Sequence, residues 1–230
     1  MKKIIYLIVV VLLSILISGC NNSNNNAKET SVHSTAKTTS TDSKSNKTTP
    51  KKDNNYISSG PLTKVGQWSK SDVGVKDTLM GISTPEKRII LGPLKITIHD
   101  IKLLKDENIP EDTVDEIDNL LNVNIGNSIN TIQIDYTIEN TSNKNVGFNL
   151  IDTLTTNTKI QINGNDYIGT QSDDGRYIGK VKVDNSKIFL YQQDTFDNLN
   201  SISLLTTDVY DDDNTLTNYH TPTKIQIDLN

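Results

Sequence analysis

The densest group of side chains that can bind a metal ion is acidic and lies near the C-terminus. Asp208, Asp211, Asp212 and Asp213 stand close together in the sequence, and carboxylate oxygens are the ligands that Ca²⁺ prefers. The stretch lacks the glycine and the later glutamate of a helix-loop-helix calcium loop, so a solvated loop between two strands is the alternative. We therefore expect no cofactor other than one candidate, a calcium ion held by these four residues.

Paired carboxylates are a second chemistry that the composition permits. The chain has 28 Asp and Glu residues, and nearly all of them follow position 55. Two carboxyl groups on either side of a glycosidic bond catalyse its hydrolysis in most glycoside hydrolases. Because their separation depends on the fold, the sequence leaves a hydrolase of cell-envelope polymers open as an alternative function.

Other chemistries lack the residues they need. The single cysteine excludes an intrachain disulfide and a cysteine-based zinc cluster. Nothing in the sequence places His99 near His220, and no Gly-x-Ser-x-Gly motif offers a nucleophilic serine. The formal net charge of −5 gives no electrostatic basis for binding nucleic acid. We therefore expect a protein that is not an enzyme and has no nucleic-acid partner.

The N-terminus has the features of a secretory signal. Lys2 and Lys3 precede an apolar stretch over residues 4–17, which is too short to cross the roughly 30 Å hydrocarbon core of a bilayer. The tetrapeptide Ile-Ser-Gly-Cys that ends at Cys20 resembles the lipobox of bacterial lipoproteins. This resemblance implies that residues 1–19 are a cleaved signal peptide and that Cys20 carries a thioether-linked diacylglycerol. The membrane would then be a partner, with the chain held on the outer face of the cytoplasmic membrane.

A linker follows the cysteine. Residues 21–55 are nearly all Asn, Ser, Thr and Lys, and Val32 is the only large aliphatic residue among them. Such a segment buries too little apolar surface to offset the entropy of ordering. We therefore predict that residues 20–55 are the lipidated cysteine and a disordered linker with a root-mean-square reach of about 30–35 Å.

Residues 56–230 have mostly the period-two pattern of β-strands. The clearest strand is 131–139, in which Ile132, Ile134, Tyr136 and Ile138 alternate with polar residues. Residues 140–145 are typical of a turn, and so we predict a hairpin to a strand at 146–150. Tight turns are also predicted at 163–164 and at 184–185.

A parity change interrupts the strand over residues 94–103. Leu94, Ile96 and Ile98 share one parity, whereas Ile101 and Leu103 share the other. We interpret the change at Asp100 as a β-bulge, or as a strand passing between two sheets. A last strand closes the chain at residues 225–229.

One segment has helical spacing. Pro110 and two acidic residues precede Val114, Ile117 and Leu120, which predicts a short amphipathic helix over 110–121. The fold class is therefore all-β, an antiparallel sandwich with a short helical insert, and a closed barrel is the alternative. We assign residues 56–89 to an N-terminal extension and residues 90–230 to the sandwich.

Two strands carry a family resemblance. Residues 94–103, and residues 132–141 with their Glu-Asn-Thr ending, are similar to those of uncharacterised Gram-positive lipoproteins with an immunoglobulin-like domain. Those proteins in turn resemble a small secreted immunoprotective antigen of mycobacteria. The resemblance implies an immunoglobulin-like β-sandwich at the cell surface with an unknown ligand.

Together these features predict an extracytoplasmic, membrane-anchored lipoprotein that acts as a binding or interaction module at the cell envelope. Its partner would be an unknown envelope protein or a glycan, contacted through the loops 105–112, 140–145 and 206–221. The alternatives are the envelope hydrolase with paired carboxylates and a calcium-stabilised structural domain.

Overall fold

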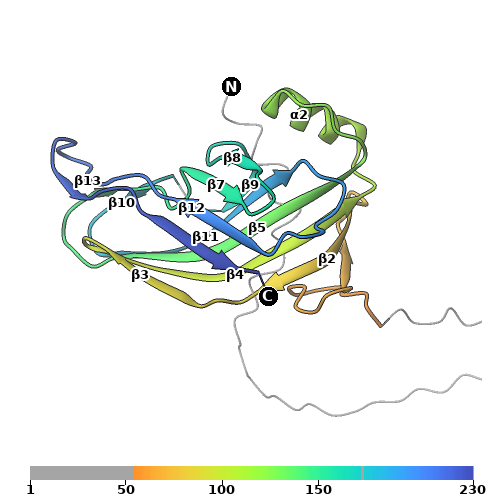
Figure 1. Ribbon diagram of the computed structural model, residues 1–230, viewed down its shortest axis with the longest axis horizontal. Coiled ribbons are helices and arrows are strands. Elements are labelled where there is room, and N and C mark those ends of the chain that lie inside the picture. Colours follow the sequence, from red (N-terminus) through yellow and green to blue (C-terminus); the bar gives the residue numbers. More distant parts are fainter. Residues whose placement is uncertain (1–53, 172–173, 230) are drawn as a thin grey trace, which may run out of the picture.

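The structure of the protein is a computed structural model that describes residues 54–171 and 174–229. The predicted signal peptide, Cys20 and the linker up to residue 53 lie outside the described residues. Figure 1 shows helix α2 at one end of the long strands β4 and β5, and strand β13 at the opposite end. The predicted all-β fold with one helical insert is confirmed, because the described residues form antiparallel sheets and a single helix.

A seven-stranded sheet forms one layer. Its order is β1-β2-β4-β5-β11-β9, and β3 pairs with β4 beside β2. The longest strands lie in its centre, where β4, β5 and β11 are paired along most of their lengths. The bounds are β1 Trp68–Lys70, β2 Lys76–Ser83, β3 Lys87–Leu91, β4 Leu94–Glu107, β5 Ser128–Asn140, β9 Tyr167–Gln171 and β11 Val181–Tyr191.

Two four-stranded sheets form the other layer. Their orders are β10-β6-β13-β14 and β15-β12-β7-β8. The bounds are β6 Val146–Gly147, β7 Thr153–Thr156, β8 Gln161–Asn163, β10 Arg176–Tyr177, β12 Ser201–Leu205, β13 Val209–Asp211, β14 Asn218–His220 and β15 Lys224–Asp228. The main core lies between the layers. There Ile132 and Ile134 of β5 belong to the same cluster as Phe148, Leu204 and Ile227, and burying such side chains contributes roughly 1.5–3 kcal/mol each.

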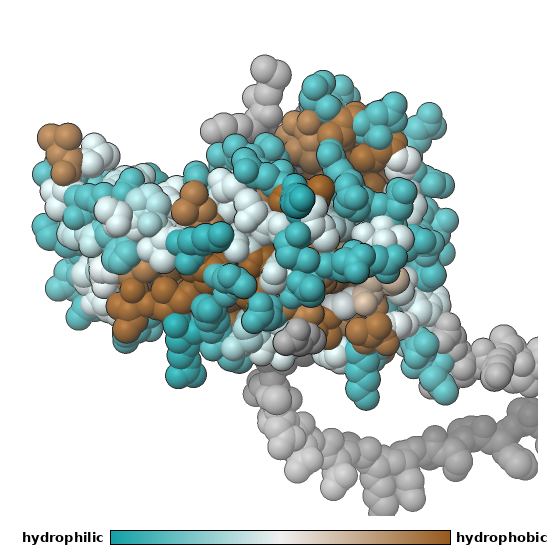
Figure 2. All heavy atoms as spheres, viewed as in Figure 1, coloured by the Kyte–Doolittle hydropathy of each residue, from teal (hydrophilic) through white to brown (hydrophobic). Residues whose placement is uncertain are grey.

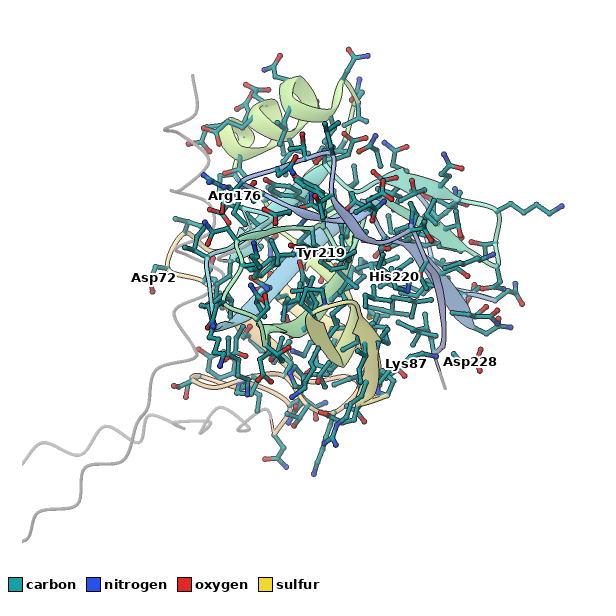
Figure 3. The ribbon with its side chains drawn as sticks, turned by 90° about the vertical axis from the view of Figure 1, so that its left-hand side faces the viewer. Asp72, Lys87, Arg176, Tyr219, His220 and Asp228 are labelled. Carbon is teal, nitrogen blue, oxygen red and sulfur yellow. The ribbon has the colours of Figure 1, made fainter. Side chains whose placement is uncertain are left out.

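Side chains bridge the two layers along one seam. The Lys87 ammonium of β3 donates to the carbonyl oxygen of Gln226 at 3.0 Å, and Ser83 Oγ donates to that of Asp228 at 3.0 Å. Figure 3 shows Lys87 and Asp228 next to each other at this seam. Among the described strands, no backbone ladder joins β3 to β15, and so the fold is a sandwich rather than a closed barrel.

The predicted bulge is confirmed, since the pairing of β4 with β5 shifts register between Ile98 and Asp100.

The predicted hairpin after residue 139 is wrong, because β6 pairs with β10 and β13 in the opposite layer. The chain also changes layer at Asn163-Gly164 instead of forming a hairpin, as β8 pairs with β7 and β9 with β11. A turn pattern in the sequence indicates that the chain changes direction. It carries no information about which strand the segment after the turn pairs with.

The predicted turn at 184–185 is wrong as well. Residues 181–191 form the single strand β11, and Asp184 and Asn185 pair with Thr137 and Tyr136 of β5. Asp184 contributes to the polar outer face of the sheet, whereas Asn185 lies on the opposite face, the one that carries Tyr136. A local pattern cannot distinguish two such polar strand positions from a turn.

Helix α2, Glu111–Leu121, confirms the predicted insert. Pro110 precedes it, two acidic residues occupy its first turn, and Asn122 ends it in the left-handed conformation. The helix buries Ile117 in a small cluster with Ile129 of β5 and Leu190 of β11. No helix in the described part of the chain has the length and apolar character needed to span a membrane.

The segment assigned to an N-terminal extension, residues 56–89, contributes β1, β2 and the first part of β3 to the main sheet. Ahead of β1, the backbone of Asn55 already accepts a hydrogen bond from Trp68 N at 2.9 Å. Leu62 then packs against Leu79 and Leu104 on the sheet face that points away from the main core. Residues 55–67, which precede β1, therefore cover part of the outer sheet face, and we call this segment the strap.

Candidate functional site

The outer face of the seven-stranded sheet carries a groove of about 710 Å³. Strand alternation places Lys102, Leu104 and Asp106 of β4 on this face, because Ile101 and Leu103 belong to the main core. Strands β2, β5 and β11 add further polar side chains, namely Asp77, Thr131, Gln133, Asp135, Thr137, Lys182, Asp184 and Ser186. The groove therefore concentrates acidic side chains from strands that are far apart in the sequence.

The centre of the groove holds a lysine between two aspartates. Lys102 Nζ lies 2.9 Å from Asp135 Oδ2 and 3.0 Å from Asp100 Oδ1. Asp135 also accepts hydrogen bonds from Ser186 Oγ at 2.5 Å and from Gln133 Nε2 at 2.9 Å. The lysine is only 9% exposed, so this ion pair is largely removed from water.

The ion pair drives the pKa values of the two aspartates apart. Burial, together with the hydrogen bond to Asp135, raises the pKa of Asp100 to about 6, even though Lys102 opposes the rise. Burial also acts on Asp135, but Lys102 and the hydrogen bonds outweigh it and lower the pKa of Asp135. Burial likewise lowers the pKa of Lys102, yet the two aspartates outweigh this and shift it upward. At neutral pH the centre of the groove thus contains a fixed cation and a strongly acidic carboxylate.

A second aspartate pair lies further along the groove, toward α2. Asp77 of β2 and Asp106 of β4 are register partners, and each carboxyl group affects the pKa of the other. Burial raises the pKa of Asp77 to about 6. Burial, followed by the charge of Asp77, raises the pKa of Asp106 well above its usual value. Thr131 Oγ1 donates to Asp106 Oδ2 at 3.1 Å.

A hydrogen-bonded chain occupies the opposite end of the groove. Thr137 Oγ1 donates to Asp184 Oδ1 at 2.5 Å and therefore accepts from His99 Nε2 at 2.7 Å. His99 Nδ1 faces Glu86 at 3.2 Å. This end of the groove is satisfied by its own side chains.

Some groove oxygens lack such partners. Asp77 Oδ1 and Asp106 Oδ1 are buried and receive no hydrogen bond from a donor group of the other described residues. Asp77 is 9% exposed and Asp106 8%. A buried acceptor without a donor costs about 1–3 kcal/mol, and so these oxygens favour a ligand that brings hydrogen-bond donors.

Other surfaces offer less chemistry. A hollow of about 690 Å³ lies between residues 123–130 and 190–194, but Lys105 and Asp194 are the only Lys, Arg, Asp, Glu or His residues that line it. In Figure 2 hydrophobic residues gather over α2 and beside β3, where Leu120 and Ile90 are 50% and 72% exposed. These side chains belong to separate elements, and we therefore take the groove as the candidate site.

The four residues predicted to bind calcium point to different protein partners. Asp208 accepts from Asn218, and Asp211 accepts from Tyr219 Oη at 2.7 Å. Asp212 pairs with Arg176 at 2.8 Å, and Asp213 accepts from Asn145; Arg176 and Tyr219 are labelled in Figure 3. Among residues 54–171 and 174–229, no three His, Cys, Asp or Glu side chains are gathered to hold a metal ion. The structure does not assemble these aspartates into one ligand set, and the calcium site stays a prediction.

The groove differs from the contact surface expected from the sequence. Of the loops 105–112, 140–145 and 206–221, only the first contributes to the groove, through Asp106. The sequence pattern placed Asp135 on the polar face of its strand but gave no sign that this face is partly buried. It could not pair Asp77 with Asp106 either, because that contact depends on the pairing of β2 with β4.

Comparisons with known proteins add little to this geometry. No family model matches the sequence, and no curated protein does. Two chains of solved structures match. One is the crystal structure of a functionally unknown protein from Listeria monocytogenes EGD-e, with 17% identity and a TM-score of 0.43, over 56% of this chain and 74% of that one.

Proposed function

We propose that the protein is a lipid-anchored, extracytoplasmic binding module and that the groove on the seven-stranded sheet is its ligand site. The lipobox-like sequence ending at Cys20 supports the anchor. Two acyl chains on this cysteine would hold the protein firmly, since each buried methylene contributes about 0.8 kcal/mol. The all-β sandwich is compatible with the immunoglobulin-like domain that the sequence resemblance implies.

The observation that carries the ligand site is the buried charge in the groove. Lys102, Asp106 and Asp77 are each 9% exposed or less, and buried ionic groups are often neutral or unfavourable for stability compared with apolar residues of similar volume. Buried groups with displaced pKa values cluster at functional sites. The volume of the groove also lies within the range of small-molecule sites.

The ligand site is tested by filling the groove. Gln133 of β5 lines its centre, and the variant Gln133→Trp places a large side chain there; Gln161→Trp on the exposed surface of β8 is the matched control. The full chain and both variants are used to capture components of cell-envelope extract. We expect one envelope component to be retained by the wild type and by Gln161→Trp and lost by Gln133→Trp. Equal retention by all three proteins contradicts the groove as the ligand site.

The anchor is tested separately. We expect labelled palmitate to enter the wild-type protein and a Cys20→Ser variant to leave the membrane fraction. A Cys20→Ser variant that stays in the membrane as firmly as the wild type contradicts the anchor and leaves the groove experiment unaffected.

A second candidate function is a cell-envelope hydrolase. It is favoured by the opposite pKa shifts of Asp100 and Asp135, because neighbouring carboxyl groups with separated pKa values are how many hydrolases obtain an acid and a base. We would expect the release of fragments from purified wall polymers, lost in both Asp100→Asn and Asp135→Asn. Absence of fragment release by the wild type between pH 4 and 8 removes this candidate.

A further inference from the structure

We infer that the Asp77–Asp106 end of the groove binds the ammonium group of a ligand that carries it on an aliphatic stem. The inference rests on the proposed function and names the chemistry that the groove recognises. Four features of this end lead to it: the absence of a protein cation, the unpaired acceptors, the apolar wall and the small number of oxygen ligands.

The first feature is the missing cation. Asp100 and Asp135 have Lys102 beside them, whereas no ion pair among the described residues includes Asp77 or Asp106. The lysines adjacent in sequence, Lys76 and Lys105, both bind Glu107 at 3.1 Å. They point to the opposite face because residues of a strand alternate. The ammonium group of a ligand would form ion pairs with Asp77 and Asp106, as Lys102 does with Asp100 and Asp135.

The second feature is a set of unpaired acceptors. Asp77 Oδ1 and Asp106 Oδ1 lack a donor group from the described protein, although both residues are more than nine-tenths buried. An ammonium group has three donors and no acceptor, which suits a site whose unpaired atoms are all acceptors.

The third feature is the apolar wall next to the pair. Leu104 of β4 and Leu62 of the strap line the groove, and both belong to one small buried cluster. Pro61 and Ile188 add further aliphatic surface. A ligand that packs a methylene stem here while its charged end reaches the carboxylates gains about 0.8 kcal/mol per buried CH₂.

The fourth feature argues against a metal ion. Ca²⁺ takes six to eight oxygen ligands, but this end offers two carboxyl groups and the hydroxyl of Thr131. No group of three metal-ligating side chains occurs in the described part of the chain. An ammonium ion needs far fewer contacts, and so an amine fits the site better than calcium.

The test compares n-pentylammonium with neutral 1-pentanol by isothermal titration calorimetry on the full chain at pH 8. The two probes have the same stem and differ in the charged group. We expect the wild type to bind the ammonium probe at least tenfold more tightly than the alcohol. The variants Asp106→Asn and Asp77→Asn should each lose at least tenfold in affinity for the ammonium probe, with little change for the alcohol.

The matched control is Asp166→Asn, which makes the same chemical change at an exposed position outside the groove and should bind like the wild type. Because two independent variants are used, misfolding of one does not remove the test. Equal binding of the two probes by the wild type, or preferential binding of Ca²⁺, overturns the inference. If the groove-filling variant still abolishes capture of an envelope component, the proposed function survives such a result.

Discussion

Two aspartate pairs lie on the same sheet face, and they differ in one neighbour. The Asp100–Asp135 pair encloses Lys102, whose ammonium group contacts both carboxylates. The Asp77–Asp106 pair has Leu79 and Leu104 as its neighbours on the same face. Where the cation is present, one aspartate has a raised pKa and the other a lowered one; where it is absent, both are raised. The comparison shows that burial alone favours protonation and that a single lysine decides which carboxylate stays charged.

The largest effect is expected from removing the lysine. Lys102→Met leaves Asp100 and Asp135 buried without a cation, and breaking a buried ion pair in this way costs about 3–5 kcal/mol. We expect the free energy of unfolding in urea to fall by this amount at pH 8. The loss should be smaller at pH 5, where Asp100 takes up a proton.

The matched control for this change is Lys95→Met on the same strand. Lys95 lies 3.9 Å from Glu139, and its side chain is 58% exposed, so its ion pair should contribute less than about 1 kcal/mol. Equal losses from the two variants would show that the buried position of Lys102 has no special effect.

The next largest effect is the pH dependence of the wild type. Asp77 and Asp100 both have a folded pKa of about 6 against an ordinary value of 3.8. Between these values the folded state keeps protons that the unfolded state has released, so the free energy of unfolding falls as pH rises from 4 to 6. The upward shift at Asp77 alone corresponds to about 3 kcal/mol, whereas the lowered pKa of Asp135 acts only below pH 4.

Urea unfolding at pH 4, 5, 6 and 7 measures this dependence, and Asp77→Asn should weaken it and leave the part that is due to Asp100. A free energy of unfolding that rises steadily across this range would contradict the raised pKa values.

The smallest effect separates the two pairs by sign. At pH 8, where Asp77 with its pKa of about 6 is ionised, Asp106→Asn replaces a second buried carboxyl group by an amide that can donate to Asp77, and it should stabilise the fold by about 1–3 kcal/mol. Asp135→Asn removes the main partner of Lys102 and should destabilise it by about 2 kcal/mol, as expected for a lost hydrogen bond to a charged group. Thermal and urea unfolding of both variants check the signs, and a shift in the same direction for both would end the comparison.

Parts of the fold that depend on local periodicity could be predicted from the sequence. The strand at 131–139, the bulge at Asp100 and the helix over 110–121 all follow from the spacing of apolar residues and lie where expected. The errors concern partners. The strand that follows residue 145 joins the opposite layer, and Asp184 and Asn185 lie inside a long strand, one on each face of the sheet.

The candidate site was less predictable than the fold, for a physical reason. A polar residue on one face of a strand has the same sequence pattern whether that face meets water or a partly enclosed groove. Asp135 alternates with core residues in either case, and only the strap at Leu62 and the neighbouring strands bury its surroundings. The buried lysine likewise occupies an ordinary outward position of β4.

Sequence alone determined the all-β character, the short helix and the expectation of a lipid anchor at Cys20, because periodicity and signal motifs are properties of consecutive residues. Tertiary structure decided that four aspartates from β2, β4 and β5 meet in pairs and that only one pair has a lysine beside it. Pairing between strands joins positions that are distant in the chain, and burial changes the charge of a carboxyl group without changing the residue.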